Sequence, residues 1–172
     1  MRDPQITSKI MSSVKSRDTR PEMVLRSALW HRGLRFRVRY RVTGRPDIVF
    51  PGPRVAVFVD GDFWHGNSWR VRGMSSFEAQ FERMNNAEFW RAKIIGNMLR
   101  DERVAQDLAD ADWTVYRVFE SRLKTDLASV VDEIEQLVRS KAASRRRQST
   151  TSPEESNGIL VDGSGEGKCR DQ

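Results

Sequence analysis

The chain has 172 residues and carries 30 lysines and arginines against 24 aspartates and glutamates, a net charge of +6. This length is enough for one domain with a substantial core. The basic balance favours a polyanionic partner such as nucleic acid. The single cysteine, Cys169, excludes a disulfide framework and a zinc site built on cysteines. No segment resembles a signal peptide or reaches membrane-spanning length, so we expect a cytoplasmic protein with no membrane contact.

The first half of the chain combines one helical pattern with several short strand patterns. Residues 1–18 are polar and basic with isolated apolar positions, a pattern that fits a short amphipathic helix or an ordered arm, and we expect this arm to contact DNA. A Thr-Arg-Pro-Glu capping box then predicts a helix from about residue 20 to 32. A strict alternation of apolar residues and arginines over 35–42 predicts a strand. The apolar runs 47–50 and 54–59 follow after short links, which predicts two further antiparallel strands.

A row of arginines occupies the polar face of the strand expected at 35–42. We interpret this row as the solvated face of an edge strand, because charge at an edge prevents sheet-to-sheet aggregation. The row consists of Arg35, Arg37, Arg39 and Arg41.

The second half of the chain predicts a long loop, two helices and one more strand. Residues 60–84 have no regular pattern, and a loop of this length is usually functional or disordered. A helix from about 85 to 110, a strand at 113–119 and a helix at 127–138 follow. The order α-β-β-β-α-β-α predicts an α/β fold in which a mixed sheet of about four strands is flanked by helices. The long helical crossover makes the last strand parallel to the one before it.

The chain therefore divides into three expected parts. Residues 1–18 are the arm and residues 19–140 are the folded domain. Residues 141–172 lack apolar periodicity, so we expect a disordered tail that cannot repay its ordering entropy.

Residues 59–66, Val-Asp-Gly-Asp-Phe-Trp-His-Gly, combine groups that suit catalysis on a nucleic acid. Asp47 opens one expected strand and Asp60 ends the next, so their oxygens could gather around a hard cation such as Mg²⁺. His65 suits a general base, since its pKa lies near working pH. Phe63 and Trp64 on a turn are suited to stacking on a flat partner. The combination predicts a metal-dependent nuclease, although Asp47 alone is equally compatible with a simple turn residue.

A set of motifs spread over residues 8–138 resembles the very-short-patch-repair (Vsr) endonuclease family, a branch of the restriction-endonuclease-like superfamily. Each motif is weak alone, but their shared order and spacing make the set specific. The matching residues are Met11, Ser16-Arg17-Asp18-Thr19, Glu22, Gly44-Arg45-Pro46-Asp47, Gly61, Phe63-Trp64-His65, Phe89-Trp90, Lys93, Asn97, Trp113 and Glu120. The resemblance implies a restriction-endonuclease-like core and Mg²⁺-dependent nicking of double-stranded DNA beside a T:G mispair.

The resemblance also implies roles for the catalytic groups. Asp47 corresponds to the catalytic, metal-binding aspartate, and His65 to the general base. Glu22 corresponds to an acidic residue that supports the site, although a capping box alone would account for it. The backbone carbonyl of Val59 and the carboxylate of Asp60 are further candidate metal ligands.

The expected DNA contacts come from five residues. Met11, Phe63 and Trp64 correspond to side chains that wedge between base pairs at the mispair, where unstacking is easier than in matched DNA. Lys93 and Asn97, on the long helix, correspond to further DNA-binding residues. The alternative for Phe63 and Trp64 is that they anchor the loop to the core.

The chain departs from the family at a structural zinc site. Many members bind zinc through cysteine and histidine residues around the Phe-Trp-His segment and through a later cysteine. In this chain Asp62, Asn67, Trp69 and Ser121 occupy that neighbourhood. We therefore expect no structural zinc.

Three functions remain open from the sequence. The first is a monomeric mismatch-repair nickase, for which mismatch-repair proteins are candidate partners. The second is a Vsr-like nuclease of a restriction or defence system without mismatch preference. The third is a non-catalytic DNA-binding relative, against which the joint presence of Asp47 and His65 argues, since an uncompensated carboxylate repels DNA phosphates.

Overall fold

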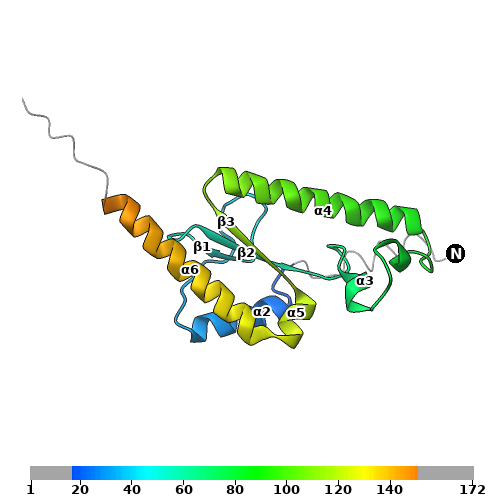
Figure 1. Ribbon diagram of the computed structural model, residues 1–172, viewed down its shortest axis with the longest axis horizontal. Helices are drawn as coiled ribbons and strands as arrows, with labels where there is room; N and C mark the ends of the chain where they lie inside the picture. Colours follow the sequence, from blue (N-terminus) through cyan, green and yellow to red (C-terminus); the bar gives the residue numbers. More distant parts are fainter. Residues whose placement is uncertain (1–16, 151–172) are drawn as a thin grey trace, which may run out of the picture.

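The computed structural model describes residues 17–150, in which helices cover both faces of one sheet (Figure 1). The elements in chain order are α2 (Arg20–His31), β1 (Ile48–Phe50), β2 (Val55–Asp60), α3 (Ser68–Val71), the 3₁₀ helix η1 (Glu78–Gln80), α4 (Ala87–Asp110), β3 (Thr114–Phe119), α5 (Glu120–Thr125) and α6 (Leu127–Thr150). The α/β class predicted from the sequence is confirmed. None of the helices in this part of the chain is long and apolar enough to cross a membrane.

The sheet has the order β1-β2-β3, with β2 in the centre. β1 pairs with β2 in antiparallel register, Ile48 opposite Val57, because only a short turn joins them. β3 pairs with β2 in parallel, Val55 opposite Thr114, because α4 carries the chain back along the sheet between them. Both predicted pairings are confirmed, but within residues 17–150 the sheet has three strands rather than four.

The missing strand is the one predicted over residues 35–42, and that prediction was wrong. Only Arg37 forms a bridge, to Val49 of β1. Arg39 has a φ of +56°, a left-handed conformation that ends any extended run. Phe36 packs on the face of the sheet that carries Phe50, whereas Val42 packs on the opposite face. The segment therefore passes around the edge of β1, which a strand with all its apolar side chains on one face could not do.

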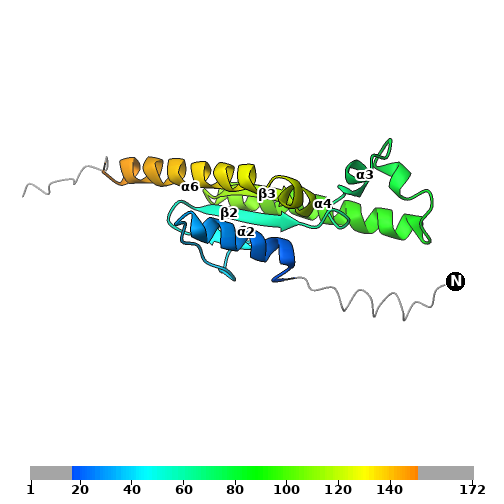
Figure 2. The same cartoon turned by 90° about the horizontal axis from the view of Figure 1, so that it is seen from below.

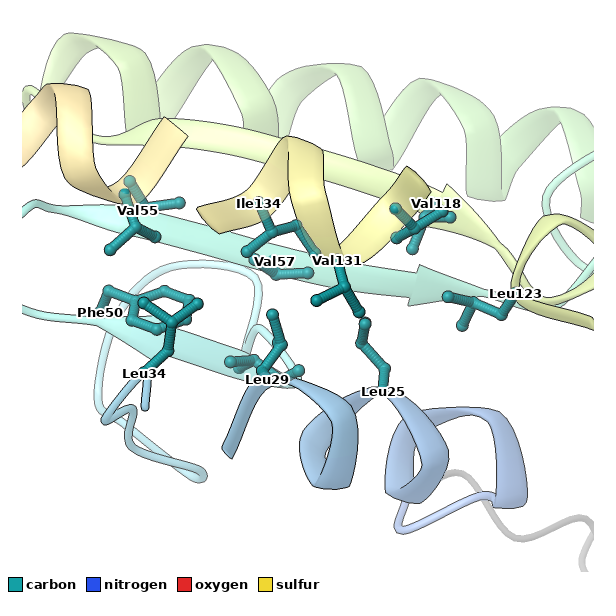
Figure 3. Packing of buried hydrophobic residues seen from close by; sticks show 13 residues of the cluster. Leu25, Leu29, Leu34, Phe50, Val55, Val57, Val118, Leu123, Val131 and Ile134 are labelled. Carbon is teal, nitrogen blue, oxygen red and sulfur yellow. The ribbon is translucent and has the colours of Figure 1, made fainter. Parts of the chain in front are cut away.

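Alternating residues of β2 divide the core between the two faces of the sheet. Val55 and Val57 point to the face covered by α2, α5 and α6, and Ala56 and Phe58 point to the face covered by α4. Figure 3 shows the larger cluster, in which side chains from α2, α6 and the sheet meet. Its labelled members are Leu25, Leu29, Leu34, Phe50, Val55, Val57, Val118, Leu123, Val131 and Ile134. Burial on both faces explains why the β2 sequence is almost continuously apolar.

The last helix is longer than its sequence pattern predicted. The apolar residues of α6 end at Val138, yet the helix continues to Thr150 and runs past the end of the sheet (Figure 2). Ala142 and Ala143 are strong helix formers, and Arg145 forms an ion pair with Asp112. The expected tail boundary at residue 141 thus falls inside a helix. Residues 1–16 and 151–172, which hold most of the expected arm and tail, lie outside the described residues.

Candidate active site

The candidate site forms where β2 ends and the chain enters the segment between β2 and α4. This segment contains α3 and η1 and lies with the first half of α4 beyond the ends of β2 and β3 (Figures 1 and 2). Gly66 makes the close approach to α4 possible, because it has a φ of +74° and a Cβ there would lie 2.7 Å from the Met98 sulfur. The segment that was predicted to be irregular is therefore held against a rigid helix.

Asp47 lies immediately before β1, in a partly buried position. Its Oδ2 accepts a hydrogen bond of 2.8 Å from the backbone N–H of Val59, and its own N–H donates to the Val57 carbonyl. Its Oδ1 accepts no hydrogen bond from the described residues. Burial raises the pKa of Asp47 to about 6, and the nearby carboxylates of Glu22 and Asp60 act in the same direction. A partner cation would therefore stabilise the ionised form of this carboxylate.

Glu22 is brought to the same site by α2 and is only 3% exposed. Its carboxylate accepts hydrogen bonds from the N–H groups of Asp18 and Thr19, so its capping role is present. Arg26, one turn later, donates from Nη2 both to Glu22 and to the backbone carbonyl of Asp47, at 2.9 and 3.1 Å. Glu22 and Asp47 face one cavity. The capping interpretation and a role at the site are thus compatible.

A second group of charged residues lies on the α4 side of β2 and β3. Arg117 donates two hydrogen bonds to Asp60, at 2.8 and 2.7 Å, and its Nη2 lies 3.0 Å from Asp101 of α4. Burial acts to lower the pKa of Arg117, but the hydrogen bonds and charges of Asp60 and Asp101 outweigh it and raise that pKa. Asp60 is therefore already charge-balanced by a guanidinium, which makes it a weaker candidate metal ligand than Asp47.

His65 completes this group and is oriented by Asp101. The Nδ1 atom of His65 lies 2.5 Å from Asp101 Oδ2 and 3.7 Å from Asp60 Oδ1. A carboxylate that accepts the Nδ1 proton leaves Nε2 with its lone pair, which is the arrangement that a general base needs. Asp60 also lies close enough to Asp47 to raise its pKa, so the two halves of the site adjoin.

The aromatic residues form a half-buried cluster beside this site. The rings of Phe63 and Trp64 lie 5.0 Å apart, and Trp90 of α4 lies 5.5 and 5.9 Å from them. Phe89, 56% exposed, extends the cluster from Trp90. Neither Phe63 nor Trp64 is a core residue, and each keeps part of its surface open.

The other predicted DNA-binding residues differ in their placement. Asn97 is buried and donates a hydrogen bond of 2.9 Å to the backbone carbonyl of Trp64, so it supports the aromatic turn from α4. Lys93 is exposed on α4, a turn before Asn97. Met11 lies outside the described residues.

Asp62, Asn67 and Ser121 form a hydrogen-bonded triangle. They are three of the residues that the sequence places in the neighbourhood of the family's zinc site. Asp62 and Asn67 are both buried, and Asp62 Oδ1 accepts from Asn67 Nδ2 and from the Ser121 hydroxyl, at 2.5 and 2.7 Å. The Ser121 N–H donates to Asp62 Oδ2. Trp69 lies outside the triangle, with Arg70 stacked on its ring. The triangle ties the turn after β2 to the start of α5.

Sequence reasoning missed three residues of the site, namely Arg26, Asp101 and Arg117. Each carried a weak signal. Arg26 follows Glu22 by one helical turn. Asp101 shares a helix face with Asn97, and Arg117 is the one charged residue in an otherwise apolar strand pattern.

The raised pKa of Asp47 predicts a pH-dependent effect of its removal. The folded pKa of about 6 exceeds the ordinary value of 3.8, so the fold favours the protonated form. Stability from this group is present at low pH and lost as pH rises through about 6. In EDTA, Asp47→Asn should thus be more stable than wild type at pH 7.5, by roughly 2–3 kcal/mol. Denaturant unfolding should show this gap closing towards pH 4, and the exposed control Asp107→Asn should change stability much less than Asp47→Asn at pH 7.5. A gap independent of pH would contradict the assignment.

The Arg117 network predicts a large loss of stability on removal of the guanidinium. Arg117→Met leaves the buried Asp60 carboxylate unpaired, and breaking such a pair costs roughly 3–5 kcal/mol. The control Arg91→Met removes an exposed ion pair with Glu78 and should cost far less stability than Arg117→Met. Adding Asp60→Asn to Arg117→Met should recover part of the loss in urea unfolding. Equal effects of the two arginine substitutions would show that the network is not structural.

Comparison with known proteins identifies several related endonucleases. The family model described as DNA mismatch endonuclease Vsr matches residues 1–71. The type II nicking enzyme V.NmeDIP of Neisseria meningitidis serogroup C is 38% identical over 139 residues, 80% of this chain and 89% of the relative. The type II nicking enzyme V.HpaIIP of Haemophilus parainfluenzae is 37% identical, over 66% of this chain and 77% of the relative. The DNA mismatch endonuclease Vsr of Escherichia coli (strain K12) is 36% identical, over 71% of this chain and 74% of the relative.

These relatives span most of the described chain, and the fold and site fit an endonuclease with a restriction-endonuclease-like core. The chain belongs to the Vsr family of endonucleases.

Proposed function

We propose that this protein nicks double-stranded DNA beside a T:G mispair and that the reaction depends on Mg²⁺. The observation that carries the proposal is the pairing of two units at the end of β2. One is the partly buried Asp47 with its raised pKa, and the other is the Asp101–His65 hydrogen bond. Together they offer an anionic metal ligand and an oriented base, the two groups that hydrolysis of a phosphodiester needs.

Asp47 fits the role of metal ligand. One oxygen of its carboxylate accepts no hydrogen bond from the described residues, and burial destabilises its negative charge. Among residues 17–150 there is no cluster of three or more acidic, histidine or cysteine side chains that could hold a metal ion. Mg²⁺ needs no such cluster, because it is usually held by one or two carboxylates together with waters and substrate phosphate. The Val59 carbonyl is a candidate second ligand, since its residue already hydrogen-bonds to Asp47 through the N–H. Mg²⁺ bound there would supply charge stabilisation at the scissile phosphate.

His65 is the proposed general base. Asp101 accepts the Nδ1 proton, so Nε2 takes a proton from the attacking water and the adjacent carboxylate stabilises the imidazolium that forms. Arg117 holds Asp101 and Asp60 in place, so it is a positioning residue rather than a catalytic one. Glu22 keeps Arg26 against the backbone of Asp47 and has the same kind of role.

The aromatic cluster supports mismatch recognition. Phe63 and Trp64 are presented as a pair on a turn, braced from behind by Trp90 and by the Asn97 hydrogen bond. Braced rings lose little freedom when they enter an opened base step, and a mispaired step opens at lower cost than a matched one.

A second candidate is a Vsr-like nuclease without mismatch preference. It is favoured by the names of several relatives, which are type II nicking enzymes, and by the absence of the family's cysteines from the segment around Asp62. Both candidates share the proposed hydrolysis, and they differ only in the preferred duplex.

We further propose that the Asp62–Asn67–Ser121 triangle does structurally what a zinc ion would do. Elemental analysis of protein purified without chelator should find far less than the one zinc per chain expected of a structural site. EDTA should leave the melting temperature unchanged, because hydrogen bonds need no metal. Stoichiometric zinc, or a large loss of stability in EDTA, would contradict this proposal.

The nicking assay compares two duplexes that differ by one base, one with a T:G mispair and one with T:A. With Mg²⁺, the wild type should nick the T:G duplex faster. Asp47→Asn should abolish nicking, whereas the exposed control Asp107→Asn should not. His65→Ala should lower the single-turnover rate ~10²–10⁴-fold without loss of affinity.

The preference of the wild type between the two duplexes decides between the two candidates, and the aromatic substitutions test whether Phe63 and Trp64 produce that preference. Phe63→Ala and Trp64→Ala should each weaken binding to T:G DNA, by ~1–3 kcal/mol per stacked base, and narrow the preference over T:A. Equal nicking rates of the wild type on the T:G and T:A duplexes would favour the second candidate. Full activity in Asp47→Asn would overturn the catalytic assignment in both.

A further inference from the structure

A cavity of about 620 Å³ adjoins Asp47, and its lining includes five arginines. One wall carries Glu22 and Arg26 from α2, and the other is the segment 39–47. The arginines of this cavity are Arg17, Arg26, Arg39, Arg41 and Arg45. Part of the row interpreted from the sequence as the solvated face of an edge strand therefore lines the cavity beside the catalytic carboxylate, and no strand forms there.

The backbone of this segment holds an uncommon and fixed conformation. Arg39 and Arg45 have φ values of +56° and +55°, although neither is glycine. Such a conformation is unfavourable for a residue that has a Cβ, and it persists only where the surroundings enforce it. Gly44, next to Arg45, makes a close approach to the core: it has a φ of +78°, and a Cβ there would collide with Val104 of α4 and lie 3.2 Å from Phe58 of β2. The turn is thus packed closely against the rigid core.

The charges of the cavity are unequally balanced. Arg26 is paired with Asp18 and Glu22, and Arg39 with Asp18. Arg41 and Arg45 are exposed and have no ion-pair partner among the described residues. Two cations on this turn, which lies beside the Asp47 carboxylate, therefore have no anionic partner among the described residues.

We propose that Arg41 and Arg45 bind backbone phosphates of the DNA strand next to the scissile phosphate. The proposal rests on the proposed function, in which the scissile phosphate lies at Asp47. An approaching phosphodiester is repelled by the carboxylates of Asp47 and Glu22, and two neighbouring guanidiniums offset that repulsion. Their planar donor groups match phosphate oxygens in pairs, and the turn holds them in register with the site. These contacts position the strand for cleavage and carry no sequence information.

The test is the salt dependence of DNA binding, measured by fluorescence anisotropy in EDTA so that no hydrolysis occurs. Each phosphate contact adds about 0.9 to the slope of log affinity against log salt. Arg41→Gln and Arg45→Gln should each lower this slope by about one, and the double variant by about two. Between 50 and 200 mM salt, the wild type should lose about three- to fourfold more affinity than either single variant. The loss should be equal for T:G and T:A duplexes.

Arg37→Gln is the matched control. It removes one positive charge from the same exposed segment, but Arg37 does not line the cavity. Its slope should equal that of the wild type, and melting curves should show all four variants folded. Equal slopes for Arg37→Gln and the cavity variants would overturn the proposal, because the effect would then be one of net charge. Failure of the proposed function would give a different result. The wild type would then show no nicking or no preference for the T:G duplex, while the salt slopes of the cavity variants would still differ from that of Arg37→Gln.

Discussion

The parallel pairing of β2 with β3 is the constraint on which the rest of the site depends. Its register sets Phe58 opposite Arg117 and Asp60 opposite Phe119, so Arg117 reaches along the α4 face to Asp60 with both hydrogen bonds. Its guanidinium also stacks over the Phe58 ring, 4.7 Å from its centre. The crossover that makes the pairing parallel is α4, and α4 carries Asp101 to the same guanidinium. One topological feature thus assembles three charges and, through Asp101, orients His65.

The antiparallel pairing of β1 with β2 builds the other half of the site. It places the Val59 N–H against the Asp47 carboxylate, at a position where burial disfavours the negative charge. The same position would be a poor one for a purely structural carboxylate. Burial raises the pKa of Asp47 even though the nearby Arg26 acts to lower it, and such a shift marks Asp47 as a candidate functional carboxylate. The stability of the metal-free fold is lower for it, which is a common feature of catalytic positions.

Hydrogen bonds then fix the loop that carries the aromatic pair. The Asp62–Asn67–Ser121 triangle holds it to α5, and Asn97 holds Trp64 to α4. Both attachments lead back to elements that flank β3, so His65 and the rings of Phe63 and Trp64 share one support. The cavity turn at Gly44 lies against α4 and β2, because it closely approaches Val104 and Phe58. His65, the aromatic pair and the cavity turn are therefore all supported by β2, β3 and the helices next to them.

The sequence by itself determined the elements with local signals. The capping box at Thr19, the apolar runs of β1 and β2 and the stripe of α4 each predict their element, because helix and strand periodicity depend on near neighbours. Asp47, His65 and Glu22 were also proposed as site residues from the sequence, since their motifs are compact. Only the tertiary structure decided that residues 35–42 pass around a sheet edge rather than form a strand, and that α6 continues past its apolar stripe. It alone joined Asp60 to Arg117 and His65 to Asp101, because those contacts span 57 and 36 residues and arise from packing that no local pattern encodes.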